Sequence, residues 1–285
     1  MYYFLIILSV ILFGGSFALN DGYRKREGGS IRASLMFTFT SSVAGLIILM
    51  AINGFKFEFT PFTFVIALLA SLIGFGFTYC SFKALGRINL SLYSLFSMLG
   101  GMVLPFLQGI FFYNEPVTLA KILCFILICI ALILTLEKSE KRNGLIYYIG
   151  IFILNGMSGV LSKLFTSLPF EKTSAEGYSI LIAICTTVLS GLILLIFFRE
   201  EKSAPSISSI VLSAGNGIAN KIANMWLVIA LANVDASVQY PMVTGGVMIV
   251  STAISFFSKI KPSNKELLSV LIAFLGMLAL FAIPI

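Results

Sequence analysis

A stripe of polar side chains runs through an otherwise apolar stretch of the sequence near residue 220. At 100° per residue of an α-helix, its members share one arc of the helix surface: Ser213, Asn216, Gly217, Asn220, Lys221 and Asn224. An ammonium attracts anions, and amides offer both hydrogen-bond donors and acceptors. The stripe therefore favours a binding site for a carboxylate, a phosphate or a zwitterion. The alternative is a structural stripe, in which the asparagines bridge helices and Lys221 pairs with an acid.

Other polar residues in apolar stretches are candidates for the same site. In these stretches, tyrosine and amide side chains serve either as ligands or as packing and helix-bridging groups. The substrate-binding candidates are Tyr79, Tyr93, Asn155, Gln239 and Tyr240. They are predicted to join the Lys221 stripe in one cavity, and the packing interpretation stays open for each of them.

Two charged residues stand near the ends of apolar stretches. Glu115 precedes Pro116, and we expect it to cap or orient the loop into the predicted span 117–136, with a role in coupling transport as the alternative. Lys163 is expected to snorkel toward the membrane surface.

The composition excludes most enzyme classes. Of the 285 residues, 59% are hydrophobic and 11% are charged, whereas a soluble fold carries about 25% charged residues. The chain has no histidine and no Walker, HExxH or GxSxG motif, so we expect no enzyme, no metal site and no cofactor. The basic residues are scattered over many short loops, which argues against a nucleic-acid partner.

Long apolar stretches set the architecture. A hydrocarbon core of about 30 Å needs roughly 20 apolar residues per helix. The sequence contains ten such stretches, which predict an all-α membrane protein with ten transmembrane helices at about 2–20, 31–52, 61–84, 88–112, 117–136, 144–167, 177–198, 207–232, 234–257 and 264–284.

The two halves of the chain resemble each other at an offset of 146 residues. This shift places residues 45–49 on 191–195, Ser91 on Ser237 and Pro116 on Pro262. The pattern predicts two five-helix repeats, residues 1–140 and 141–285. Because five is odd, the second repeat enters the membrane inverted, an arrangement that suits alternating access around a central site.

Lysine and arginine predict the orientation. Fourteen of them lie in or beside the loops that follow odd-numbered spans, and four lie toward the opposite face, at Lys56, Lys121, Lys163 and Lys172. By the positive-inside rule, both termini are expected outside the cell.

Two motifs carry a family resemblance over nearly the whole chain. Pro105 followed by residues 109–118 (GIFFYNEPVT), and the run Phe13–Phe17, are similar to patterns of the drug/metabolite transporter superfamily, in its ten-helix, two-repeat EamA-like branch. Where the second half should repeat the acidic residue, it has Lys261. The resemblance implies a secondary transporter, commonly an exporter of amino acids or related metabolites, with a cavity lined by spans 1, 3, 4, 6, 8 and 9. It also implies cytoplasmic termini, opposite to the charge count.

The leading hypothesis is a multi-pass exporter in the cytoplasmic (inner) membrane for a small anionic or zwitterionic, amino acid-like metabolite. The first alternative is the efflux of cationic or aromatic compounds in exchange for protons, with Glu115 or Asp21 as the coupling acid. It is disfavoured because no predicted span carries an acid at mid-depth. The second alternative is a non-transporting membrane scaffold. The partners predicted are the small-molecule substrate and the lipid bilayer, with a homodimer as a further possibility.

Overall fold

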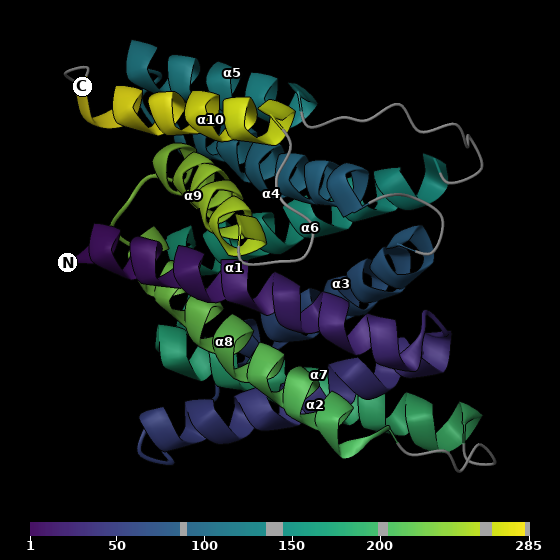
Figure 1. Ribbon diagram of the computed structural model, residues 1–285. Helices are drawn as coiled ribbons and strands as arrows, with labels where there is room; N and C mark the ends of the chain where they lie inside the picture. Colours follow the sequence, from purple (N-terminus) through teal and green to yellow (C-terminus); the bar gives the residue numbers. More distant parts are fainter. Residues whose placement is uncertain (86–89, 135–144, 199–204, 257–263, 283–285) are drawn as a thin grey trace.

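The structure is a computed structural model that describes residues 1–85, 90–134, 145–198, 205–256 and 264–282. The described residues are almost entirely helical (Figure 1). The helices are α1 (Tyr2–Glu27), α2 (Ile31–Ile52), α3 (Pro61–Leu85), α4 (Leu90–Tyr113), α5 (Leu119–Leu134), α6 (Leu145–Ser167), α7 (Ala175–Phe197), α8 (Ile207–Leu231), α9 (Ala236–Phe256) and α10 (Asn264–Ala282).

Several of these helices are long enough to cross a bilayer. Among the described residues, five helices are continuous apolar segments of at least 19 residues, in α1, α2, α3, α6 and α7. The prediction of a helical membrane protein is therefore confirmed. The first predicted span was too short, because α1 continues to Glu27, where Asp21 pairs with Arg24 and Lys25 on the next turn.

Serine caps fix the starts of three helices. The side chains of Ser30, Ser174 and Ser206 accept hydrogen bonds from backbone amides at the N-termini of α2, α7 and α8. Gly28 ends α1 with a φ of 80°, a conformation that glycine adopts without strain. These local signals explain why connections as short as residues 28–30 suffice.

The helices pack so that the two halves of the chain interleave. Helix α8 lies along α1 and α2, and α6 lies along α3 and α4. Helices α2 and α7 pack together, as do α4 and α9. The pair α5 and α10 lies at one edge of the bundle in Figure 1, against α9.

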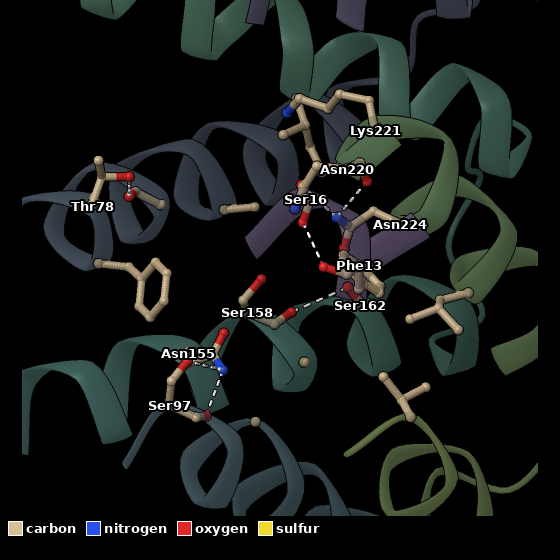
Figure 2. A pocket seen from close by; sticks show the side chains of 18 of the residues that line it. Phe13, Ser16, Thr78, Ser97, Asn155, Ser158, Ser162, Asn220, Lys221 and Asn224 are labelled. Atoms are coloured by element: carbon tan, nitrogen blue, oxygen red, sulfur yellow. Dashed lines mark hydrogen bonds between the residues drawn. The ribbon is translucent and has the colours of Figure 1, made fainter. Parts of the chain in front are cut away.

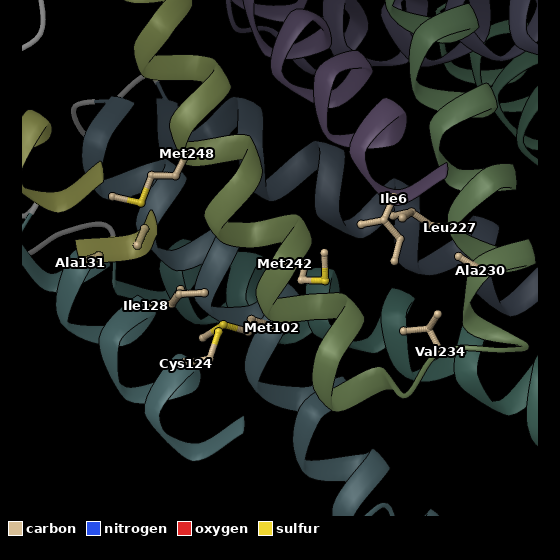
Figure 3. Close-up of a cluster of buried hydrophobic side chains, with 11 residues drawn as sticks. Ile6, Met102, Cys124, Ile128, Ala131, Leu227, Ala230, Val234, Met242 and Met248 are labelled. Atoms are coloured by element: carbon tan, nitrogen blue, oxygen red, sulfur yellow. The ribbon is translucent and has the colours of Figure 1, made fainter. Parts of the chain in front are cut away.

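A buried apolar cluster joins the edge pair to the rest of the bundle (Figure 3). Met102 on α4, Met242 and Met248 on α9 and Ile128 on α5 are all within it. Methionine adapts to irregular gaps between helices, which suits a contact among so many elements.

Two glycines allow the closest helix contacts. A Cβ atom on Gly217 of α8 would lie 1.9 Å from the carbonyl oxygen of Ser41 on α2, and one on Gly100 of α4 would lie 2.0 Å from that of Phe152 on α6. No other residue fits at such distances, so glycine fixes how closely these helices approach.

Candidate functional site

A cavity of about 430 Å³ lies inside the bundle (Figure 2). Its described lining comes from α1, α2, α3, α4, α6, α7, α8 and α9, and no described residue of α5 or α10 reaches it. The family resemblance implied six of these helices, and the structure adds α2 and α7. Phenylalanines that the sequence analysis did not propose as binding residues also line the cavity: Phe13, Phe17, Phe37 and Phe77.

Lys221 is the charged residue of the described lining. Its aliphatic stem packs over Gly45 of α2, where an added Cβ would meet the Lys221 Cγ at 2.5 Å. The Lys221 ammonium forms no hydrogen bond or ion pair with any residue that the structure describes. The predicted structural alternative, an acid paired with Lys221, therefore has no support among these residues. An ammonium away from bulk water and without a counterion is a favourable partner for an anion.

The asparagines of the stripe divide into two groups. Asn216 is buried and donates to the carbonyl oxygen of Ser16 on α1 at 2.8 Å, so it bridges two helices. Asn224 donates to the backbone carbonyl and the side-chain oxygen of Asn220 at 2.8 and 2.9 Å and remains exposed. All three asparagines line the cavity, and Figure 2 shows Asn220 and Asn224 on the same side of it as Lys221.

The wall opposite Lys221 belongs to α6 and α4. Asn155 donates to the carbonyl oxygen of Ser97 on α4 at 2.6 Å, and Ser162 donates to the carbonyl oxygen of Ser158 at 3.1 Å. Figure 2 shows these side chains across the cavity from Lys221. The Asn155 amide therefore has a helix-bridging role, while the Ser158 hydroxyl on the same wall is free to contact a ligand.

Residues of α9 close the cavity at the end of the bundle where the chain begins. Tyr240 donates to the carbonyl oxygen of Gly159 on α6 at 2.9 Å, and Gln239 donates to the carbonyl oxygen of Leu227 on α8 at 3.0 Å. Gln239 is 1% exposed, and two further lining residues, Leu231 and Tyr178, are also buried. Toward the other end, Asn20 and Thr78 line the cavity and are partly exposed. This difference in burial indicates that the cavity is sealed at the terminal end.

Two predicted tyrosines do not join the described site. Tyr79 is 40% exposed and lies outside the cavity, with its ring 5.9 Å from the Lys83 Nζ on the same helix. The interpretation of Tyr79 as a cavity residue is corrected here, because its neighbours Phe77 and Thr78 occupy the inner face instead. The side chain of Tyr93 lies outside the described residues.

Glu115 and Lys163 form a buried ion pair. The Lys163 Nζ lies 2.8 Å from a carboxylate oxygen of Glu115. Lys163 is 8% exposed and Glu115 is 7% exposed. Glu115 also accepts hydrogen bonds from the backbone amides of Ala236 and Ser237 at 2.9 Å and from the Ser237 hydroxyl at 2.6 Å. Burial raises the pKa of Glu115, but these hydrogen bonds outweigh it and hold the pKa below its usual value of 4.5.

This pair corrects two predictions. Glu115 caps the N-terminus of α9 rather than the next helix along the chain, and Lys163 does not snorkel because a carboxylate lies within reach. The sequence did carry a signal for this ion pair, because the predicted spans place residues 115 and 163 at the same face of the membrane.

A second ion pair lies beside the first. Lys121 of α5 is 2.7 Å from the Asp235 carboxylate and donates to the carbonyl oxygen of Pro116 at 2.9 Å. The Asp235 side chain is 42% exposed. Together the two pairs attach the α4–α5 loop to α6 and to the start of α9.

Comparison with known proteins informs the fold alone. No protein-family model matches the chain, and no curated protein matches it. A solved crystal structure is similar, with a TM-score of 0.74 and 18% sequence identity over 96% of this chain and 94% of the other. The arrangement of helices therefore also occurs in a structure solved by crystallography.

Proposed function

We propose that this protein is a secondary transporter for a small anionic or zwitterionic metabolite, and that it works as an exporter by alternating access. The observation that carries the proposal is the position of Lys221, whose ammonium lacks a partner among the described residues and borders a cavity between helices of both halves. A group that costs free energy to desolvate favours a ligand of opposite charge.

The lining supports an anionic group on the substrate over a cationic one. No described lining residue is acidic, and Asn220 and Asn224 supply amides near the Lys221 side chain. The acids of the rival cation-efflux hypothesis are occupied elsewhere, Asp21 with Arg24 and Lys25, and Glu115 with Lys163. We therefore retain the anion or zwitterion as the substrate class.

The packing supports an inverted repeat. If each helix of the first half is exchanged with its counterpart five positions along, the same contacts recur. The contact of α1 with α8 corresponds to that of α6 with α3, and the contact of α2 with α8 corresponds to that of α7 with α3. Helix α3 begins at residue 61 and α8 at residue 207, the same offset of 146 residues that relates the two halves in sequence. Figure 1 shows α1 and α6 running in opposite directions, as an inverted pair must.

The closed end and the charge asymmetry support export as the direction of transport. The excess of lysine and arginine favours termini outside the cell, an orientation in which the sealed end of the cavity faces outward. The cavity is then reached from the cytoplasm, which is the loading state of an exporter.

Counterflow in proteoliposomes tests the proposal. Purified wild type and Lys221→Met are compared with amino acids, other carboxylates, nucleotides and organic cations, with Lys56→Met in an exposed loop as the matched control. We expect exchange of anions or zwitterions by wild type and Lys56→Met, and its loss in a folded Lys221→Met variant. Equal anion exchange by Lys221→Met, or exchange of cations alone, would contradict the proposal.

A further inference from the structure

The carboxylate of Glu115 joins three helices at the sealed end of the cavity. Its residue follows α4, its backbone amide donates to the carbonyl oxygen of Gly109 on that helix, and an added Cβ on Gly109 would lie 2.6 Å from the carboxylate. The same carboxylate binds Lys163 on α6 and the start of α9 at Ser237. One side chain therefore fixes the positions of α4, α6 and α9 relative to one another.

We infer that the Glu115–Lys163 ion pair is a latch that keeps the cavity closed at this end, and that the pair must break for the substrate to leave. The inference rests on the proposed function, because a latch has meaning only if the cavity opens. It adds a positioning role to two residues that do not line the cavity.

The geometry ties this latch to the seal. Tyr240 and Gly159, whose hydrogen bond closes the cavity, lie one turn from Ser237 and Lys163 on the same two helices. Separation of α9 from α6 at the cavity would therefore also separate Ser237 and Lys163 around Glu115. The hydrogen bonds of Glu115 to α9 and its ion pair with Lys163 must therefore break before this end can open.

A buried ion pair suits a device that breaks and re-forms. The desolvation of the two charges offsets part of their attraction, so separating the pair into water costs less than the attraction alone, while its geometry in the closed form is strict. The neighbouring pair of Lys121 and Asp235 is more exposed at the acid and is a weaker constraint. It serves as the matched control.

The sequence of the second half does not repeat the acid of this latch. At the offset of 146 residues, Glu115 and Pro116 correspond in sequence to Lys261 and Pro262, which lie outside the described residues. The carboxylate of the latch therefore occurs in the first of the two repeats alone. We expect the protein without substrate to favour the form closed at the terminal end.

Cysteine accessibility tests the latch without any transport measurement. The native cysteines at 80, 124, 129 and 185 are replaced by alanine, and Ser158→Cys places a thiol on the cavity wall. Labelling by a membrane-impermeant maleimide is then measured from the side that carries an N-terminal tag. The test variants are Glu115→Gln and the double variant Glu115→Gln with Lys163→Gln, and Asp235→Asn is the control.

The double variant leaves no buried charge unpaired, so it remains informative if Glu115→Gln fails to fold. Because a close charge pair is worth about a factor of ten or more, we expect labelling from the terminal side to rise about tenfold or more in both test variants, with Asp235→Asn near the parent rate. Labelling of the folded double variant at the parent rate would overturn the latch, as would rapid labelling of the parent from that side. Anion exchange retained by Lys221→Met would contradict the proposed function and leaves the labelling result unchanged, so the two failures are distinguishable.

Discussion

Replacement of Gly217 by alanine tests how strictly the α2–α8 contact is defined. The added methyl group would lie 1.9 Å from the Ser41 carbonyl oxygen and 2.5 Å from its carbon, both backbone atoms that no rotamer change can move. The helices would have to separate, which would also lengthen the 2.7 Å hydrogen bond from the Ser41 hydroxyl to the Ser213 carbonyl oxygen.

The expected loss of stability follows from two opposing effects. Overpacking costs about 1–3 kcal/mol, and the 1.9 Å approach to a backbone oxygen puts Gly217 at the upper end of that range. Because alanine recovers about 0.8–1 kcal/mol of helix propensity, we expect a net loss of about 2 kcal/mol, which for a chain of this size corresponds to roughly 4–8 °C in melting temperature. The matched control is Gly215→Ala on the same helix, where the nearest atom would be Leu19 Cδ1 at an ordinary 3.4 Å.

Thermal unfolding in detergent measures both variants against wild type. We expect Gly217→Ala to melt several degrees lower and Gly215→Ala to melt at or slightly above the wild-type temperature. If Gly217→Ala melts with wild type, or if both variants lose the same amount, the close α2–α8 contact described here is incorrect.

Three further predictions concern the cavity and its closed end. Gly45→Ala would place a methyl group 2.5 Å from the Lys221 Cγ and 3.1 Å from the Gly217 carbonyl oxygen, so the Lys221 stem would be displaced. Since a hydrogen bond to a charged group is worth about 1.5–3 kcal/mol, we expect counterflow to show that the solute exchanged by wild type binds about tenfold more weakly. The lowered pKa of Glu115 stabilises the folded protein fully above about pH 4.5, and this stability is lost as the pH falls through the lower pKa of the folded state. The melting temperature of wild type should therefore fall more steeply in acid than that of Glu115→Gln. Parallel curves of melting temperature against pH would contradict this. Tyr79→Phe should leave counterflow unchanged, because the ring lies outside the cavity, and a large loss of exchange would restore Tyr79 to the site.

The helices were largely predictable because apolar length is a strong signal in a membrane. The predicted spans 31–52 and 207–232 match α2 (Ile31–Ile52) and α8 (Ile207–Leu231) to within a residue at each end. The first span was predicted to end at residue 20, since the basic residues beyond it interrupt the apolar run, although the helix itself continues to Glu27.

The residues of the site could be predicted where a polar side chain interrupts an apolar helix, and not where the helix is apolar throughout. The stripe around Lys221 was visible because lysine and asparagine are rare inside apolar helices, and the structure brings its members to the cavity. Tyr79 was misplaced because α3 is apolar on all faces, so the sequence does not distinguish its lipid-facing side from its inner side. The Glu115–Lys163 pair was missed because it joins residues from different halves, and only the packing of α4 against α6 brings them together.

Three carboxylates of the first half bind backbone amides at the starts of helices in the second half. Glu27 accepts from Ser206 before α8, Glu58 from Ser174 before α7, and Glu115 from Ala236 in α9. In all three the acid comes from the first half of the chain and the amide from the second, so these contacts are directional. A protein produced as two separate pieces, divided between α5 and α6, would lose all three contacts until the pieces found each other. The three carboxylates therefore make each piece depend on the other for the caps of its helices.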